Sequence, residues 1–297
     1  MLMLLFRTLA KLPLRVLHGV GASMGWLTYW ASASYRRRYQ ANVQIAGLAW
    51  RAARGGIAGA GRMMMEIPWL WMRPPSLPLG DFVRWHGAEL IEQALAHGRG
   101  IVMLTPHLGC FEITAQAYAE RFASPEAPIT VLYRPARQLW LRTVVEASRS
   151  RPGLATAPAT LAGVRQMIRA LRRGQTIGLL PDQVPPEGLG VWAPFFGRSA
   201  YTMTLAARLL QQTGATPLLI WGERLSAGRG YAIHVYPGPE ISADSAPESA
   251  ASLINQSMEQ LIRLAPEQYL WGYNRYKQPR GLDIGVAPAD VDAGREA

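Results

Sequence analysis

The chain has 297 residues, of which 49% are hydrophobic and 17% are charged, and its formal net charge at pH 7 is +11. This length is ample for a packed core, and the share of charged residues is low for a soluble protein. The single cysteine, Cys110, excludes an internal disulfide and with it a disulfide-stapled secreted scaffold.

Positive charge is concentrated at the amino terminus, where no Asp or Glu occurs before Glu66. The rest of the chain is close to neutral, with 22 basic and 20 acidic residues. A basic, apolar segment without acidic residues indicates binding to an anionic membrane surface. Nucleic acid is disfavoured as a partner because the basic residues stand among Leu, Trp and Gly. The basic residues of this segment are Arg7, Lys11, Arg15, Arg36, Arg37, Arg38, Arg51, Arg54 and Arg62.

Residues 16–35 contain no side chain that is charged at neutral pH, if His18 is taken as neutral. A helix of this length could just cross the hydrocarbon core of a bilayer. Three glycines and a modest mean hydropathy make an interfacial amphipathic anchor an equal alternative. If the segment spans the membrane, the arginines at 36–38 place the main domain in the cytoplasm.

From Ala88 onward, short apolar runs alternate with helical patterns. This alternation predicts an α/β fold, with a mixed, mainly parallel sheet flanked by helices and preceded by an N-terminal membrane-anchoring helix. The predicted helices are 88–97, 110–122, 139–150, 160–173, 201–213 and 248–264, and the predicted strands are 100–105, 129–133, 176–180, 217–222 and 231–236. We divide the chain into an anchor region at 1–65, an α/β domain at 66–282 and a disordered tail at 283–297.

The candidate catalytic site lies between the predicted strand at 100–105 and the predicted helix at 110–122. Their order places His107 at the carboxyl end of a sheet strand, where open α/β folds put their sites. With His107 in the loop and Glu112 in the first helical turn, the carboxylate can fold back onto the ring. It would fix the tautomer and stabilise the imidazolium, so that the other nitrogen takes a proton from a hydroxyl. The spacing alone is weak, because chance matches are expected, and a buried structural histidine is the alternative.

Several ordered motifs strengthen the chemical interpretation. The run His107–Glu112 (HLGCFE) resembles the H-x4-(D/E) block of the lysophospholipid acyltransferase superfamily, and in particular its lipid A biosynthesis branch, the lauroyl/myristoyl acyltransferases. The resemblance covers roughly residues 5–280. Cys110 and Phe111 stand where that family usually has Asn and Trp, which leaves the exact acceptor and donor chain open. The other blocks, in the order of the family, are Leu132–Pro135, Gly178–Gln183, Phe195–Arg198 and Leu270–Lys277.

The resemblance implies an O-acyltransferase of the late lipid A acyltransferase kind. Such an enzyme transfers a fatty acyl chain directly from an acyl carrier protein thioester, or a coenzyme A thioester, to a hydroxyl of a lipid A precursor. His107 would be the general base, and Glu112 would orient and charge it. Arg134 would stabilise the thioester oxyanion or hold a phosphate of the acceptor.

The resemblance also implies a set of residues that bind the acceptor. Asp182 would bind or position it, with a capping or turn role as the alternative. Arg198, Arg275 and Lys277 would contact its anionic groups, although Arg198 could equally be a solvated surface residue. No metal and no cofactor are implied beyond the acyl thioester as co-substrate. The implied location is the bacterial inner membrane, with the catalytic domain on the cytoplasmic side.

Two other functions remain open at this point. An acyltransferase of the same class could act on a lysophospholipid, an ornithine lipid or another glycolipid. A membrane-bound lipid-binding protein without catalysis is disfavoured by the intact His107 and Glu112 pair. Cys110 could in principle carry a covalent acyl group, but we expect it to be a small packing residue.

Overall fold

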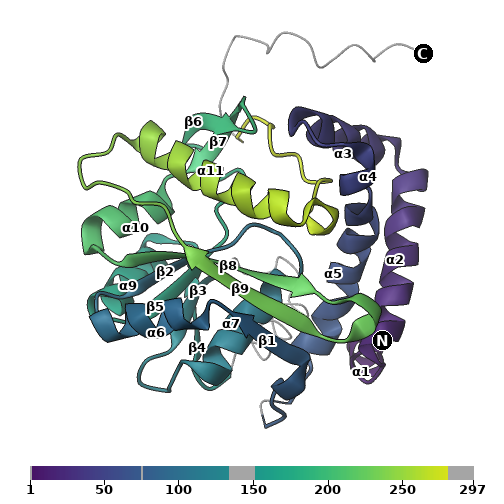
Figure 1. Ribbon diagram of the computed structural model, residues 1–297, viewed down its shortest axis with the longest axis horizontal. Helices are drawn as coiled ribbons and strands as arrows, with labels where there is room; N and C mark the ends of the chain where they lie inside the picture. Colours follow the sequence, from purple (N-terminus) through teal and green to yellow (C-terminus); the bar gives the residue numbers. More distant parts are fainter. Residues whose placement is uncertain (1, 75, 134–150, 280–297) are drawn as a thin grey trace.

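The structure is a computed structural model that describes residues 2–74, 76–133 and 151–279. Its centre is a seven-stranded sheet with the strand order β1-β9-β8-β2-β5-β3-β4 (Figure 1). Neighbouring strands run parallel except for β8 and β9, which are antiparallel. The prediction of a mixed, mainly parallel sheet is therefore confirmed. The strands are β1 (Val83–His86), β2 (Ile101–Leu104), β3 (Ile129–Tyr133), β4 (Leu154–Pro158), β5 (Thr176–Leu179), β8 (Thr216–Arg224) and β9 (Tyr231–Pro237).

Helices cover both faces of the sheet, which explains why β2 is buried at all four positions. Val102 and Leu104 belong to a core that also contains residues of α9, α10 and α11, whereas Ile101 and Met103 pack with residues of α6 and α7. Alternate residues of a strand point to opposite faces, so one short apolar strand serves both cores. These helices are α6 (Ala88–His97), α7 (Phe111–Arg121), α9 (Leu161–Arg172), α10 (Leu205–Thr213) and α11 (Pro247–Leu264).

The predicted helix at 201–213 was wrong at its start. A hairpin of β6 (Gly190–Phe195) and β7 (Arg198–Met203) occupies the residues before it. Its two-residue turn, Phe196 and Gly197, has positive φ angles of 49° and 75°, as tight hairpins require. A phenylalanine in that conformation hid the turn from the sequence pattern. The predicted helix at 139–150 lies outside the described residues.

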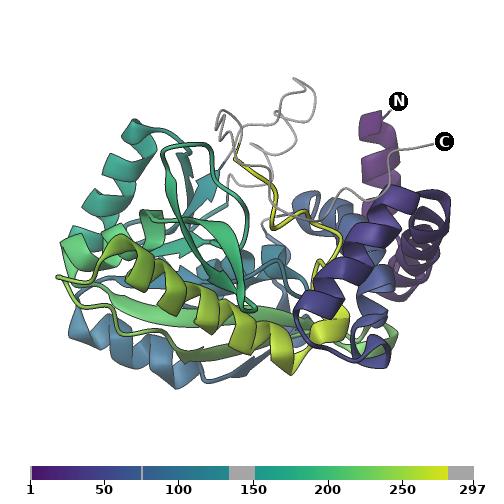
Figure 2. The same cartoon turned by 90° about the horizontal axis from the view of Figure 1, so that it is seen from above.

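In the part of the chain before the sheet that the structure describes, five α-helices pack together at one side of the molecule (Figures 1 and 2). The backbones of α2 and α5 approach so closely that a Cβ atom on Gly61 would lie 1.8 Å from the carbonyl oxygen of Gly21. At least two glycines of this region therefore serve helix packing. These helices are α1 (Leu2–Ala10), α2 (Leu14–Ala31), α3 (Ala33–Ile45), α4 (Trp50–Ala53) and α5 (Gly55–Trp71).

The uncharged stretch at 16–35 is not one helix. It is shared between α2 and α3, and the chain breaks at Ser32, whose hydroxyl accepts a hydrogen bond from the backbone N–H of Tyr35 and so caps α3. In the part of the chain that the structure describes, no helix combines the length and the apolar character needed to span a bilayer.

Candidate active site

His107 lies in the turn between β2 and α7, at the carboxyl end of β2. Its Nδ1 is 2.7 Å from Oδ1 of Asp182, and its backbone N–H donates to Oδ2 of the same carboxylate at 2.9 Å. Asp182 follows β5, which pairs with β2 in parallel, so two adjacent strand ends bring the groups together. The carboxylate beside Nδ1 is therefore that of Asp182, in the place that the sequence analysis expected for Glu112.

The groups around Asp182 favour the ionised form of its carboxyl group. The side chain is 2% exposed, and burial alone would raise its pKa. The ring and backbone N–H of His107 and the charge of Arg275 outweigh burial, and the pKa of Asp182 lies below its usual value. Asp182 is thus an ionised hydrogen-bond acceptor at neutral pH, which places the ring proton on Nδ1 of His107.

The second ring nitrogen of His107 faces Gln183. The Nε2 atom of Gln183 lies 3.0 Å from Nε2 of His107. With the amide N–H as donor and the ring proton on Nδ1, the lone pair of the imidazole is on Nε2. This is the nitrogen that accepts the proton when a carboxylate-bound histidine acts as a general base.

Glu112 sits in the first turn of α7. Its Oε2 accepts a hydrogen bond of 3.3 Å from Nε1 of Trp71, the last residue of α5. The preceding residue, Phe111, places its ring edge-on to the His107 ring, with 4.8 Å between centroids. Glu112 is therefore next in sequence to a direct ring contact of His107 and is anchored to the N-terminal helices.

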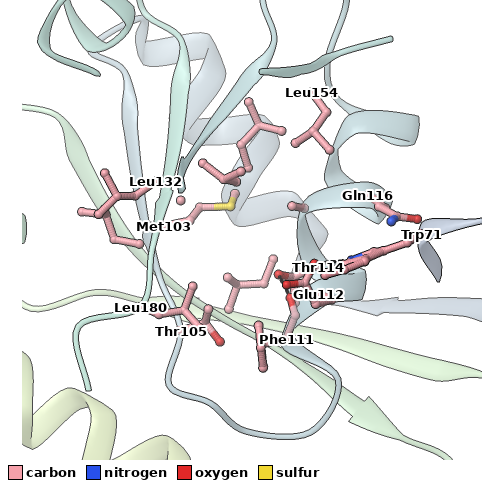
Figure 3. Close-up of a pocket in the computed structure, with 16 residues that line it drawn as sticks. Trp71, Met103, Thr105, Phe111, Glu112, Thr114, Gln116, Leu132, Leu154 and Leu180 are labelled. Carbon is pink, nitrogen blue, oxygen red and sulfur yellow. Dashed lines mark hydrogen bonds between the residues drawn. The ribbon is translucent and has the colours of Figure 1, made fainter. Parts of the chain in front are cut away.

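A mostly apolar pocket opens beside this group, between α7 and the sheet (Figure 3). It has about 700 Å³ of empty space, part of which is open to solvent. Thr105, Phe111 and Glu112 line it close to the His107 turn, and Leu154 lines it at the opposite end (Figure 3). The remaining lining residues are Trp71, Met103, Thr114, Ala115, Gln116, Ile129, Val131, Leu132, Gly178, Leu179, Leu180 and Ile220. Its mostly apolar lining suits a hydrocarbon chain.

The ends of the strands show in which direction the pocket runs. Ile129 and Leu154 are the first residues of β3 and β4 and pair with each other, so they mark the amino-terminal ends of the strands. Thr105 directly follows β2 at its carboxyl end. The pocket therefore runs beneath the sheet, away from the His107 turn.

Arg134 lies outside the described residues. It follows Tyr133, the last residue of β3. Its expected contact with an oxyanion or a phosphate stays a prediction.

Two of the predicted binding residues are on the surface. Arg198 is exposed, and its guanidinium stacks over the ring of Tyr276 at 5.1 Å. Lys277 is also exposed, with its ammonium 5.2 Å from the ring centre of Tyr273. Both charges are open to an anionic ligand.

Arg275 is placed differently, with only 2% of the residue exposed. Its Nη1 donates to the carbonyl of Tyr201 at 2.7 Å, and its Nη2 donates to Oγ1 of Thr202 at 2.8 Å. Both acceptors belong to β7. Arg275 thus attaches the carboxyl-terminal segment to the hairpin of β6 and β7. Its buried positive charge also lowers the pKa of Asp182.

Cys110 is 2% exposed and belongs to the core that contains Ile113 and Ile220. Burial raises the pKa of its thiol well above the usual value. A thiolate nucleophile is therefore disfavoured, which agrees with the expected packing role. Among the described residues, no group of three or more His, Cys, Asp and Glu side chains has the arrangement of metal ligands.

Three side chains at this site were not predicted from the sequence: Gln183, Phe111 and Trp71. Gln183 follows Asp182 in the block Gly178–Gln183, so its place after a strand is a signal that the sequence contains. Trp71 is 41 residues from Glu112 along the chain, and only the packing of α5 brings it there.

Comparison with known proteins gives one consistent family. The profile of the family described as "Bacterial lipid A biosynthesis acyltransferase" matches residues 1–278. The chain is similar to the lipid A biosynthesis lauroyltransferase of Escherichia coli, with 29% identity over 75% of this chain and 71% of that protein. It is also similar to the palmitoleoyltransferase of the same organism, with 25% identity over 73% and 68%, and to its myristoyltransferase, with 24% over 64% and 57%.

Proposed function

Since this chain belongs to the bacterial lipid A biosynthesis acyltransferase family, we propose that it transfers a fatty acyl chain from a thioester to a hydroxyl of a lipid A precursor. The single observation that carries the proposal is the placement of His107. A buried carboxylate lies against its Nδ1, and its Nε2 faces the side-chain amide of Gln183, at the carboxyl ends of the strands and beside an apolar pocket.

In the proposed reaction, Nε2 of His107 takes the proton from the acceptor hydroxyl as its oxygen attacks the thioester carbonyl. The new C–O bond gives a tetrahedral oxyanion. When this intermediate collapses, the C–S bond breaks and the thiolate takes the proton from His107, which restores the neutral ring. Asp182 holds the ring throughout and stabilises the imidazolium.

Glu112 and Arg134 complete the proposed catalytic group. Glu112 lines the pocket and follows Phe111, which contacts the His107 ring, and its carboxylate on the pocket wall would add negative charge that favours the transient imidazolium. Arg134, which follows β3 in the sequence, would meet the oxyanion or an acceptor phosphate. Arg198 and Lys277 are the exposed positive charges that would contact anionic groups of the acceptor.

The pocket beneath the sheet is the proposed site of the acyl chain. A chain that lies between Phe111 and Leu154 would have its thioester end near the His107 turn. An acyl carrier protein is the proposed donor, because its acidic surface would be attracted by a protein with a net charge of +11. Coenzyme A is the alternative thiol.

The proposed location is the cytoplasmic face of the inner membrane. One side of α2 exposes a stripe of large apolar residues at helical spacing, while the opposite side packs on α5. A stripe flanked by basic residues suits an interfacial helix on anionic lipid. The stripe consists of Val16, Val20, Met24, Leu27 and Trp30, which are 44% to 66% exposed.

A reconstituted assay tests the function. The purified full chain would be incubated with a lipid A precursor and acyl thioesters of several chain lengths, on the carrier protein or on coenzyme A, and the lipids would be analysed by mass spectrometry. The proposal expects one added acyl ester on the precursor, formed faster from the carrier-protein thioester. Acylation of a lysophospholipid or ornithine lipid in place of the precursor would contradict it.

A further inference from the structure

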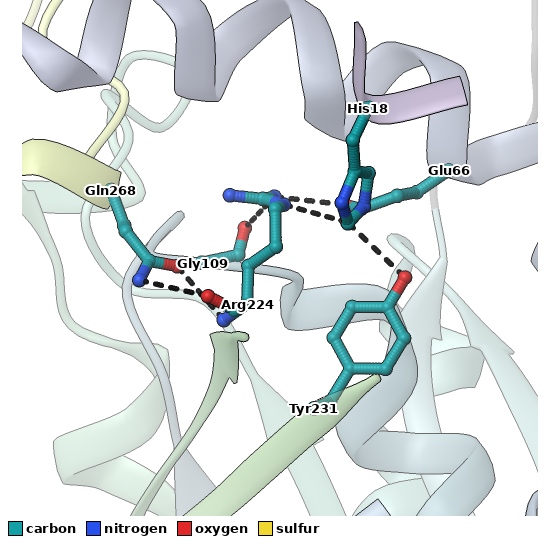
Figure 4. A network of polar contacts seen from close by, with 6 residues as sticks. All are labelled: His18, Glu66, Gly109, Arg224, Tyr231 and Gln268. Atoms are coloured by element: carbon teal, nitrogen blue, oxygen red, sulfur yellow. Dashed lines mark hydrogen bonds and ion pairs between the residues drawn. The ribbon is translucent and has the colours of Figure 1, made fainter. Parts of the chain in front are cut away.

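A buried ion pair joins the N-terminal helices to the sheet (Figure 4). Arg224, the last residue of β8, donates from Nε to Oε1 of Glu66 at 2.6 Å and from Nη2 to Oε2 at 2.8 Å. Glu66 belongs to α5 and its side chain is 1% exposed, while that of Arg224 is 4% exposed. Charge-assisted hydrogen bonds of this kind are stronger than neutral ones, and the bidentate geometry fixes the orientation of the guanidinium.

Two further groups fix the carboxylate of Glu66. Nε2 of His18, from α2, lies 2.7 Å from Oε1, and the hydroxyl of Tyr231, from β9, donates to the same oxygen at 3.1 Å. Burial would raise the pKa of Glu66, but Arg224 and the bond to His18 outweigh it and lower the pKa to about 2. The pair is therefore ionised at neutral pH.

Arg224 also reaches the turn that carries His107. Its Nη2 donates to the carbonyl oxygen of Gly109 at 3.0 Å (Figure 4). The other side of Gly109 is held through Gln268, whose carbonyl accepts from the Gly109 N–H at 3.0 Å and whose side-chain oxygen accepts from the Arg224 N–H at 2.9 Å. Both peptide groups of Gly109 are thus connected to Arg224.

The backbone at Gly109 is tightly packed against the neighbouring strand β8. Its φ angle is +57°, and a Cβ atom there would lie 2.0 Å from the carbonyl oxygen of Gly222. Gly109 stands between His107 and Glu112 in the sequence, so the hydrogen bonds that fix its carbonyl also fix the chain between the two proposed catalytic groups.

We propose that Arg224 and Glu66 are positioning residues for the acyl transfer: Arg224, held in place by Glu66, fixes the Gly109 carbonyl and thereby the geometry of the His107 turn. This inference rests on the proposed function of His107. Neither residue lines the pocket, so neither contacts the acyl chain there. Misplacement of a catalytic group by about 1 Å can cost about a hundredfold in rate, which makes such a restraint effective.

A purely structural role for the pair gives a different expectation. Replacing a buried ion pair by apolar residues of similar volume is often neutral or stabilising, whereas removal of one partner is strongly destabilising. The double variant Glu66→Met/Arg224→Met therefore separates the two roles. It removes both buried charges and the bond to Gly109 while it retains apolar packing.

The test compares the full-length wild type and the double variant by thermal unfolding, by steady-state kinetics and by hydrogen exchange read by mass spectrometry. We expect a folded protein whose melting temperature is lowered by the loss of the bonds that His18 and Tyr231 make to Glu66, a kcat lower by about tenfold to a hundredfold, an unchanged KM, and faster exchange at residues 106–112. A folded double variant with wild-type kcat and wild-type exchange at 106–112 would overturn the proposal.

Two further variants complete the experiment. Arg224→Lys retains the charge opposite Glu66 but lacks the second donor that reaches Gly109, and it decides the question if the double variant does not fold. Its kcat must fall and its exchange at 106–112 must rise, or the proposal fails. Glu223→Met/His234→Met is the control, because Glu223 is next to Arg224 on β8 and its carboxylate lies 2.8 Å from Nε2 of His234 on β9; it should leave kcat unchanged. Hydrogen exchange needs no substrate, so a wild type that transfers no acyl chain refutes the function and leaves the test of positioning intact.

Discussion

Nδ1 of His107 lies 2.7 Å from a carboxylate oxygen of Asp182, a residue 75 positions further along the chain. The same carboxylate accepts the backbone N–H of His107 at 2.9 Å. Asp182 thus fixes both the ring and the main chain of the proposed base. The acceptor-binding role expected for Asp182 stays a prediction, whereas its contact with the ring follows directly from the adjacent ends of β2 and β5.

Asp182→Asn should lower kcat by about 10³- to 10⁴-fold with a much smaller change in KM, because an amide at this place favours the wrong tautomer of the ring. The measurement is steady-state kinetics on the purified variant, with its melting temperature as a check on folding. Glu223→Gln, which changes an outer carboxylate that also contacts a histidine, is the control and should retain wild-type kcat. Equal rates for Asp182→Asn and the wild type would show that Asp182 does not orient the base.

Acid should destabilise the protein through its buried carboxylates. The pKa of Glu66 is lowered from 4.5 to about 2, and that of Asp182 is also lowered. A depressed folded-state pKa stabilises the protein above the unfolded-state pKa, and this stability is lost as pH falls through the folded-state value. For Glu66 the window is therefore pH 4.5 to 2, and its contribution is on the order of a few kcal/mol.

Urea unfolding at a series of pH values measures this effect. Glu66→Gln should be less stable than the wild type at pH 7 because Arg224 loses its counter-charge. Between pH 4.5 and 2.5, however, the variant should lose less stability than the wild type. Parallel curves for the two proteins would mean that Glu66 does not titrate with a depressed pKa.

The length of the transferred acyl chain should depend on the pocket beneath the sheet. A Cβ atom on Gly178 would lie 3.2 Å from Cγ1 of Val131, and both residues line the pocket. Gly178→Leu should therefore shift the preference to shorter chains. Leu154→Ala, at the end away from the His107 turn, should admit longer ones. Competition among acyl thioesters of different length, read by mass spectrometry, measures the preference, and two variants with unchanged product profiles would exclude this pocket.

Membrane binding should depend on the exposed stripe of α2. Leu27→Glu places a charge on a side chain that is 64% exposed, so it should weaken binding to vesicles containing anionic phospholipid by at least about tenfold, since a buried Leu contributes about 1.5–3 kcal/mol. Leu264→Glu is the matched control, because Leu264 is 58% exposed at the end of α11. Flotation assays compare the two, and equal loss or equal retention of binding would contradict a specific role of the stripe.

The alternation of apolar runs and helical patterns was sufficient to predict much of the α/β domain. The helix α6 and the strand β3 have the predicted bounds, and a fully apolar run such as β2 reports burial on both faces. The strands β1 and β4 were not predicted, because Val83–His86 is exposed at alternate positions and Leu154–Pro158 ends in a proline within a short, weakly apolar run.

The sequence was sufficient to predict where the candidate site lies, but not which of its residues contact each other. Local spacing suggested Glu112 as the partner of His107, because His107 lies in the loop before α7 and Glu112 lies in the first turn of that helix. The contact with Asp182 instead depends on the pairing of β2 with β5, which no local pattern encodes. Glu66 and Arg224 are 158 residues apart in the sequence, and they meet only because the fold places Glu66 of α5 at the end of β8.

Direct catalysis by His107 is tested by single-turnover acyl transfer by His107→Ala, with the purified enzyme in excess over a labelled acyl thioester and a lipid A precursor as acceptor. We predict a folded variant that still binds membranes and transfers the chain more slowly by several orders of magnitude, on the scale known for loss of a histidine base. Transfer at the wild-type rate, or an acyl group trapped on Cys110 of the wild type, would contradict direct transfer by His107.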